Sequence, residues 1–299
     1  MVVGQIVNLS YGGHSETMRT IVEIAEMQKA AEDARREGKR VGVVPTMGSL
    51  HAGHLSLMAL ARQRCNMLVT TLFVNPLQFG PTEDYERYPR NLQRDMELAA
   101  KAGTDILFTP DVRQMYPDGF KTIVEIPDVS SVLEGQFRPG HFAGVTTVVL
   151  KLLNITKPHV ALFGQKDAQQ AFLIRKMVTD LNLDLEIVIA PIVREKDGLA
   201  LSSRNVYLSP EERVRATSLH RALSRARERI EAGERSVEAV RKDMSSILSE
   251  ARPARVDYVA FVRPENFDEI KSIEPPAVLI LLAVRFGSTR LIDNMVVSI

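Results

Sequence analysis

The chain has a single cysteine, few aromatic residues and almost no net charge. The cysteine count and the charge balance each argue against particular kinds of site or partner. Cys65 cannot form a disulfide within the chain, and with no second cysteine it does not begin a zinc ligand set. The 38 basic residues are balanced by 37 acidic ones, whereas proteins that hold a long nucleic acid carry a basic excess. We therefore expect no nucleic acid partner.

Long apolar runs are also missing. No stretch reaches the roughly 18 consecutive apolar residues of a membrane span, and residues 1–20 lack the apolar core of a signal peptide. A cytoplasmic protein without a membrane partner is expected. Residues 1–20 also differ in character from the rest of the chain, so we interpret them as an N-terminal extension that need not be ordered, with Met1 and Met18 as alternative starts.

What is present is a regular alternation of short β-branched runs with longer amphipathic ones. The runs expected to be strands are 41–44, 68–74, 106–109, 160–163 and 187–190. The segments expected to be helices are 55–64, 91–102, 142–154 and 167–181. This alternation predicts an α/β fold with a doubly wound parallel sheet, which binds ligands at the carboxyl ends of its strands.

The pattern changes after Asn205. Ser209, Pro210 and Glu212 form a complete helix start, in which the serine caps the helix and the glutamate reaches back to the cap. One helix is expected to run to residue 231 and a second from 236 to 251, followed by strands at 256–262, 278–284 and 291–294. Because 299 residues exceed what one hydrophobic core usually serves, we place one domain at residues 21–204 and a smaller α+β domain at 205–299.

The first chemically informative segment links the first strand of that sheet to the next helix. His51 and His54 are three residues apart and share one face of the first helical turn, where free N–H groups and a partial positive charge favour phosphate. Gly48 and Gly53 allow a turn and a close approach of backbone to ligand. Two histidines that only cap or pack are the alternative, but the strand–turn–helix setting favours the phosphate site. A metal site competes less well, because no third ligand occurs nearby at a suitable spacing.

Three further polar segments end strands or link domains, and each has a plainer alternative. Lys166 and Asp167 follow a strand, where they suit a nucleotide, although Asp167 also fits a helix cap. The loop at residues 197–205 can fold over a triphosphate or serve as a polar linker. Asn75 and Gln78 follow the second strand, where they can bind hydroxyls or only close a turn. The sequence has no Walker A loop, dinucleotide-binding glycine motif or His-Glu-x-x-His motif, which excludes those chemistries.

The paired histidines and the later serine–arginine loop resemble the HIGH and KMSKS motifs of the nucleotidylyl-transfer superfamily. Within that superfamily, about residues 40–205 resemble the pantothenate synthetases, through motifs that occur in the same order. These motifs are PTMGSLHAGH (45–54), FVNPLQF (73–79), YPR (88–90), LEG (133–135), RPGHF (138–142), FGQKD (163–167) and DGLALSSRN (197–205), with RLIDN (290–294) near the end of the chain.

The resemblance implies a Rossmann-like first domain, a smaller second domain that covers the site, and a homodimer. It implies that the protein condenses pantoate with β-alanine through a pantoyl adenylate, with ATP as co-substrate and Mg²⁺ as cofactor, and releases AMP and pyrophosphate. The implied catalytic residues are His51, His54 (the proton donor), Lys166 and Arg204. The implied ATP-binding residues are Met47, Gly48, His51, Gly53, His54, Gly164, Gln165, Lys166, Asp167, Val193, Leu201, Ser202, Ser203 and Arg204. The implied pantoate and β-alanine residues are Thr46, Met47, Asn75, Gln78 and Gln170.

Three positions depart from the family pattern. Gln165 replaces a glutamate, Ala168 replaces a bulky residue, and Arg94 replaces an acidic residue next to Asp95. Asp95 is therefore the one candidate protein ligand for Mg²⁺, and the ATP phosphates are expected to hold most of the metal. Two other classes stay open at this point: a nucleotidyltransferase that releases a nucleotide-linked product, and a non-catalytic nucleotide- or tRNA-binding module.

Overall fold

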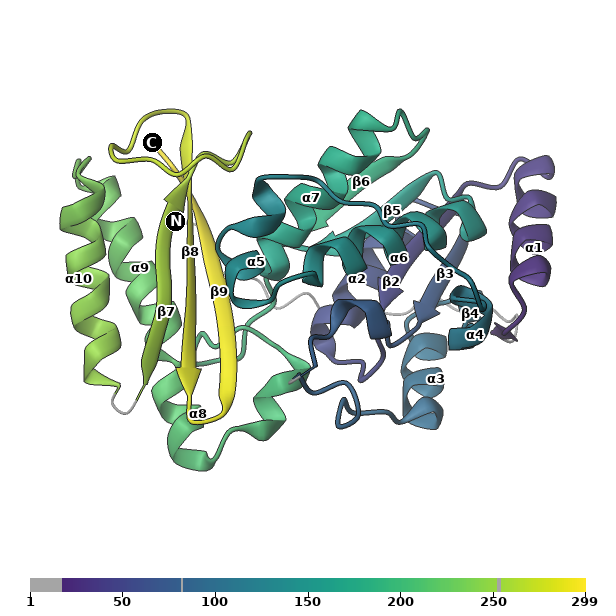
Figure 1. Cartoon of the computed structure of the whole chain (residues 1–299), viewed down its shortest axis with the longest axis horizontal. Helices are drawn as coiled ribbons and strands as arrows, with labels where there is room; N and C mark the ends of the chain where they lie inside the picture. The colour runs from purple at the N-terminus through teal and green to yellow at the C-terminus, as the bar shows by residue number, and fades with distance from the viewer. Residues whose placement is uncertain (1–17, 82, 252–253) are drawn as a thin grey trace.

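The computed structural model describes residues 18–81, 83–251 and 254–299, and its larger part is built on a six-stranded parallel sheet (Figure 1). Across this sheet the strands run in the order β1 (Arg19–Ile21), β4 (Ile106–Phe108), β3 (Met67–Leu72), β2 (Val41–Thr46), β5 (Val160–Gly164) and β6 (Glu186–Ala190). Each neighbouring pair is parallel. The predicted α/β class with a doubly wound parallel sheet is confirmed.

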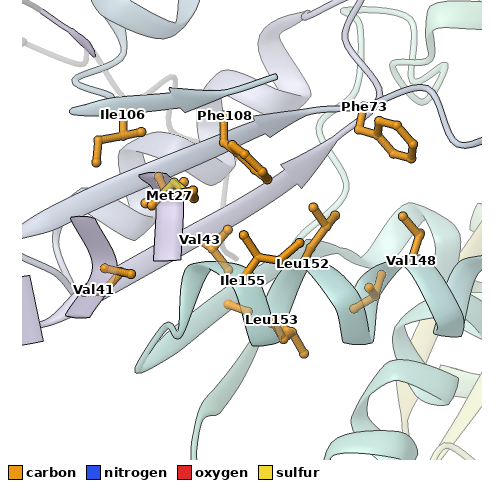
Figure 2. Close-up of a cluster of buried hydrophobic side chains, with 14 of the residues drawn as sticks. Met27, Val41, Val43, Phe73, Ile106, Phe108, Val148, Leu152, Leu153 and Ile155 are labelled. Atoms are coloured by element: carbon orange, nitrogen blue, oxygen red, sulfur yellow. The ribbon is translucent and has the colours of Figure 1, made fainter. Parts of the chain in front are cut away.

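Helices cover both faces of this sheet, because successive residues of each buried strand point to opposite sides. One face carries α1 (Ile24–Arg36), α6 (His141–Thr156) and α7 (Ala168–Asp180), and the other carries α2 (Ala52–Arg62) and α3 (Leu92–Lys101). Val43 packs in the hydrophobic core beneath α1, α6 and α7, and Val44 packs in the core beneath α2 and α3. Figure 2 shows Val43 facing Leu152 and Ile155 of α6.

The strand order fixes where a ligand can bind. β2 lies between β3 and β5, so the chain leaves β2 toward one side of the sheet and later returns to form β5 on the other side. Connections that leave in opposite directions open a crevice at the carboxyl ends of these two strands. The segments at 47–54 and 165–167 follow β2 and β5, so two polar segments that are far apart in the sequence meet there.

The C-terminal part contains a second sheet, of three antiparallel strands. It consists of β7 (Arg255–Val262), β8 (Ala277–Phe286) and β9 (Thr289–Ser298), with α8 (Pro210–Ala216), α9 (Ser218–Glu231) and α10 (Val237–Glu250). The central strand β8 is apolar almost throughout because both of its faces are covered. Ile280 and Leu282 pack in the core with α9 and α10, whereas Leu279 and Leu281 pack toward Ala168 of α7. Figure 1 shows α9 and α10 on one side of this sheet and the larger part of the molecule on the other.

Short helices occupy several connections: η1 (Pro76–Gln78), α4 (Val112–Met115), η2 (Val129–Ser131), α5 (Glu134–Phe137), η3 (Gln165–Asp167) and η4 (Ser203–Tyr207). The predicted division between residues 204 and 205 falls inside η4, and the two-domain division stays a prediction. Within the described ranges, no helix is long and apolar enough to cross a membrane.

The N-terminal end of the fold differs from the prediction. Arg19 and Thr20, assigned to the extension, begin β1 and pair with β4, so the first sheet starts earlier than expected. Residues 1–17 of the extension lie outside the described residues. Helix α1 was not predicted, although Ile24, Met27, Ala31 and Ala34 recur in it at helical spacing.

The helix predicted from residue 210 to 231 is also wrong in one respect. It is two helices, α8 and α9, which meet at Thr217. The Thr217 hydroxyl donates a hydrogen bond to the Val214 carbonyl at 2.7 Å. A threonine that bonds back to the preceding turn competes with the helical backbone hydrogen bonds, which accounts for the interruption.

Candidate active site

A cavity of about 230 Å³ opens at the carboxyl ends of β2 and β5. Most of the predicted site residues line it: Thr46, Met47, His51, Gly53, His54, Gln78, Gly164, Lys166, Asp167, Gln170, Val193, Leu201, Ser202, Ser203 and Arg204. The other four, Gly48, Asn75, Asp95 and Gln165, do not. The topology thus gathers residues of all four polar segments predicted from sequence around one cavity.

His51 and His54 cap the N-terminus of α2 with their own side chains. The Nδ1 atom of His51 accepts the backbone N–H of Gly53 at 3.2 Å. The Nδ1 atom of His54 accepts the backbone N–H of His51 at 3.3 Å. Because a nitrogen that accepts a hydrogen bond carries no proton, each ring has its proton on Nε2. Capping therefore fixes the tautomer of both rings and makes Nε2–H the donor of each.

Both of these imidazoles are neutral at pH 7. Burial, followed by the charge of Lys166, lowers the pKa of His51 from 6.5 to about 4. Burial, followed by the neighbouring His51, lowers the pKa of His54 from 6.5 to about 3. The two ring centroids are 4.1 Å apart, so charging one ring would oppose charging the other. In this state the pair offers neutral N–H dipoles to a ligand.

Asp95 holds the turn that precedes these histidines. It lies in the first turn of α3, is 1% exposed, and its carboxylate oxygens accept the backbone N–H groups of Ser49 and Leu50, each at 2.8 Å. Ser49 has φ of 52° and Gly48 has φ of 82°, so the turn needs support to stay in this conformation. Both oxygens of Asp95 serve the turn and the residue does not line the cavity. These contacts support a positioning role for Asp95, and its role as a Mg²⁺ ligand stays a prediction.

Asn75 also acts from behind the cavity wall. Its Nδ2 atom donates to Oε1 of Gln78 at 3.1 Å and to the carbonyl of Gly144 at 3.0 Å. Its Oδ1 atom accepts from the Tyr116 hydroxyl at 2.7 Å. Gln78 lines the cavity, where its Nε2 lies 2.8 Å from the sulfur of Met47. The amide hydrogens and oxygen of Asn75 are thus all bonded to protein groups, one of which is Gln78. The contact of Asn75 with substrate stays a prediction.

Two adjacent glutamines at the start of α7 have different environments. Gln169 is buried, donates to the carbonyls of Val129 and Val132 at 2.7 and 2.9 Å, and accepts the N–H of Glu134 at 3.1 Å. Gln170 lines the cavity. Only Gln170 is therefore available to a ligand, whereas Gln169 fixes the segment around η2 and α5.

The turn after β5 presents a cation and an anion side by side. Nζ of Lys166 lies 3.6 Å from Oδ1 of Asp167, and both residues line the cavity. Burial alone would raise the pKa of Asp167, but the charges of Lys166 and Arg204 lower it below its usual value. Asp167 is therefore a carboxylate at pH 7. The side chain of Gln165 points elsewhere and donates to Oδ1 of Asn294 at 3.0 Å.

The serine–arginine loop is held against the segment after η1. Arg204 forms an ion pair with Asp84, with Nη2 to Oδ1 at 2.9 Å and Nε to Oδ2 at 3.2 Å. The hydroxyls of Tyr88 and Ser203 are 3.3 Å apart. The guanidinium thus has an anionic partner within the protein that a bound phosphate could replace.

Sequence analysis missed three polar residues that line the cavity, namely Tyr88, Arg138 and His141. Arg138 pairs with Glu83 at 2.6 Å and donates to Nε2 of His141 at 2.9 Å. Nδ1 of His141 donates to the carbonyl of Gln78 at 2.8 Å. The sequence does contain a signal for these residues, because they lie in the YPR and RPGHF motifs, but those motifs alone do not indicate a role for them.

The residues present fit a metal bound mainly by its ligand's phosphates. Among the described residues, no group of three or more His, Cys, Asp or Glu side chains is placed to hold a metal ion. Asp167 is the carboxylate in the cavity lining, next to the cations of Lys166, Arg138 and Arg204. Mg²⁺ in nucleotide sites typically takes one or two carboxylates together with substrate phosphates and water, and this arrangement supplies one.

A helix N-terminus with two imidazole donors, a lysine–aspartate turn and an arginine loop meet at the switch point of a parallel sheet. This combination defines an α/β nucleotide-binding enzyme of the nucleotidylyl-transfer type. The family model described as pantoate-beta-alanine ligase matches residues 19–296. The chain belongs to the pantoate–β-alanine ligase family.

Individual relatives are similar to this chain in sequence or structure over nearly its whole length. The pantothenate synthetase of Caldicellulosiruptor bescii is 52% identical over 281 residues, which cover 94% of this chain and 99% of that protein. The solved pantothenate synthetase of Thermus thermophilus superposes with a TM-score of 0.88 at 46% identity, covering 93% of this chain and 99% of the other. The pantoate-beta-alanine ligase of Francisella tularensis, solved in complex with beta-gamma ATP and beta-alanine, has a TM-score of 0.77 at 33% identity and covers 93% and 97%.

Proposed function

We propose that this enzyme joins pantoate to β-alanine in two steps, through a pantoyl adenylate. Membership of the ligase family supports the overall reaction, and a relative solved with beta-gamma ATP and beta-alanine supports ATP and β-alanine as substrates. The observation that carries the proposal is the convergence of His51, His54, Lys166 and Arg204 on one cavity, because these groups suit a polyphosphate.

In the first step, a pantoate carboxylate oxygen attacks the α-phosphorus of ATP. The new O–P bond forms as the bond between the α-phosphorus and the bridging oxygen breaks, and pyrophosphate leaves. A carboxylate is a weak nucleophile that needs no deprotonation, so orientation supplies much of the rate, on the order of 7–11 kcal/mol for well-aligned pairs. The Nε2–H groups of His51 and His54, with the N-terminus of α2, stabilise charge on the phosphate oxygens. Lys166 and Arg204 add positive charge.

In the second step, the neutral amine of β-alanine attacks the activated carbonyl carbon. The C–N bond forms, the C–O bond to the phosphate breaks, AMP leaves, and the amine loses a proton. Gln78 and Gln170 are the uncharged groups in the cavity lining that suit pantoate and β-alanine. The loop carrying Ser202 and Ser203 closes the cavity and keeps water from the adenylate.

Mg²⁺ belongs to the proposal as a partner of ATP. When bound, it supplies charge neutralisation to the leaving pyrophosphate. Asp167, which lines the cavity, would contribute a carboxylate to it. A cytoplasmic location and a homodimer complete the proposal, and light scattering of the purified protein would measure the oligomeric state.

The deciding experiment is the exchange of labelled pyrophosphate into ATP, with Mg²⁺ and pantoate but without β-alanine. Exchange that requires pantoate is expected, because the first step is reversible and does not involve the amine. Folded protein that makes pantothenate but catalyses no exchange would rule out a free adenylate step. Folded protein that binds ATP but neither catalyses exchange nor makes pantothenate would point to activation of a different acid.

A further inference from the structure

The RLIDN motif at residues 290–294 has no role in the two-step mechanism. It lies in β9, which packs against η3, the turn that carries Lys166. Asp293 and Asn294 are each 2% exposed, and neither lines the catalytic cavity. Both instead line a small neighbouring cavity, and Lys166 and Asp167 line both cavities.

Asn294 holds the backbone of the turn after β5. Its Nδ2 donates to the carbonyls of Gln165 and Lys166, both at 2.9 Å, and its Oδ1 accepts from Nε2 of Gln165 at 3.0 Å. The side chain of Asn294 thus forms three hydrogen bonds, through Nδ2 and Oδ1, with the consecutive residues Gln165 and Lys166. No other residue type has donors and an acceptor in this arrangement at this length.

Asp293 holds the second nucleotide segment. Its carboxylate forms a two-point ion pair with Arg194, at 2.6 and 2.9 Å. Arg194 also donates to the carbonyl of Gly198 at 3.0 Å. The N–H of Leu201 bonds to the carbonyl of Val193, which closes the hairpin that leads into the serine–arginine loop. The N–H of Asn294 donates to Oδ1 of Asp293 at 2.7 Å, so the two anchors are linked.

We infer that Asn294 is a positioning residue for Lys166, and that Asp293 does the same for the loop of residues 201–204. The C-terminal strand thereby completes the ATP site without touching the nucleotide. This inference rests on the proposed function, since it concerns how ATP is bound. Its physical basis is that β9 is paired with β8 along its length and packed in its own core. It can therefore serve as a rigid support for two turns of the larger sheet.

The test measures ATP binding by calorimetry in the full-length protein, so that it does not depend on turnover. Asn294→Ala is expected to weaken ATP binding by about tenfold or more, the scale seen when support behind a binding group is removed. Asn294→Asp keeps the volume of the side chain but replaces Nδ2 by an oxygen that faces both carbonyls, and we expect a loss at least as large. Because this second variant makes no cavity, it tests the inference even if the alanine variant does not fold.

A double-mutant comparison separates positioning from general stability. If Asn294 acts through Lys166, Asn294→Ala will change ATP affinity by less than about twofold in a Lys166→Ala background. Val297→Ala, at a buried position of the same strand that packs only in the C-terminal core, is the matched control. It should lower the unfolding temperature while ATP affinity stays within about twofold of wild type.

Three results would overturn the inference. They are unchanged ATP affinity in folded Asn294→Ala, an equal loss of affinity with and without Lys166, or a loss in Val297→Ala as large as that in Asn294→Ala. Absence of ATP binding in the wild-type protein would instead refute the proposed function itself, and the inference with it.

Discussion

His54 combines two duties, because its Nδ1 caps α2 while its Nε2–H is left as a donor in the cavity lining. His54→Ala is expected to lower kcat by roughly 10²-fold or more, the loss typical of one charge-stabilising donor, as measured by steady-state formation of AMP. His159 is the matched control. Its Nδ1 accepts the N–H of Val41 at the opposite end of the sheet, so His159→Ala should leave kcat unchanged. A His54→Ala enzyme with wild-type kcat would remove the histidine from the mechanism.

The adjacent pair Gln169 and Gln170 allows a prediction in which each residue is the other's control. Gln170→Ala should raise KM for pantoate by about tenfold with ATP affinity and unfolding temperature preserved, because only a cavity contact is lost. Gln169→Ala should lower the unfolding temperature, because the carbonyls of Val129 and Val132 lose their donor. Loss of ATP binding in Gln170→Ala would show that Gln170 lies in the ATP-binding part of the cavity and not in the pantoate-binding part.

At the scale of an element, α3 supports the histidine turn through Asp95, which reaches across from its first turn. Asp95→Asn places an amide group against the N–H groups of Ser49 and Leu50. We expect weaker ATP binding and a loss of about 1–3 kcal/mol in the free energy of unfolding. The Mg²⁺ concentration for half-maximal activity should not change.

That Mg²⁺ titration decides between the two roles considered for Asp95. A positioning residue leaves the metal dependence unchanged, whereas removal of a metal ligand would shift it to higher Mg²⁺ concentration. Glu97→Gln, on the same helix, is the control for a change of charge near the site. A large shift in Asp95→Asn alone would restore the role predicted from the sequence.

At the scale of the whole molecule, buried neutral histidines make stability depend on pH. Burial, followed by the charge of Arg138, lowers the pKa of His141 from 6.5 to about 4. Between these values the unfolded chain binds more protons than the folded one. The free energy of unfolding therefore falls as the pH drops from about 6.5 toward 4, with a slope of at most about 1.4 kcal/mol per pH unit from this residue.

Urea unfolding at pH 7 and pH 5 measures this contribution. The wild-type protein should lose more stability between the two pH values than His141→Gln, whose side chain does not titrate. The reason is local, since Nε2 of His141 accepts a hydrogen bond from Arg138 and protonation would place two cations together. Equal losses in both proteins would show that the pKa of His141 is the same in the folded and unfolded states.

The sequence by itself determined the class of fold and most of the chemistry. Strands buried on both faces read as apolar runs, glycines and histidines at a strand–helix junction indicated a phosphate site, and the ordered motifs indicated the family. These signals are local, because they depend on neighbouring residues in one element. The same locality explains what was missed. The interruption at Thr217 depends on one side-chain hydrogen bond.

Only the tertiary structure decided which polar residues face the cavity and which stand behind it. Asn75 and Asp95 were predicted as ligand contacts, but the structure turns their side chains to backbone groups and to Gln78. Arg138 and His141 line the cavity because the N-terminal end of α6 packs against η1. Asn294 meets the turn of Lys166 across more than a hundred residues of chain. Such contacts join distant segments, and side-chain direction follows from the packing of whole elements, which a one-dimensional pattern does not contain.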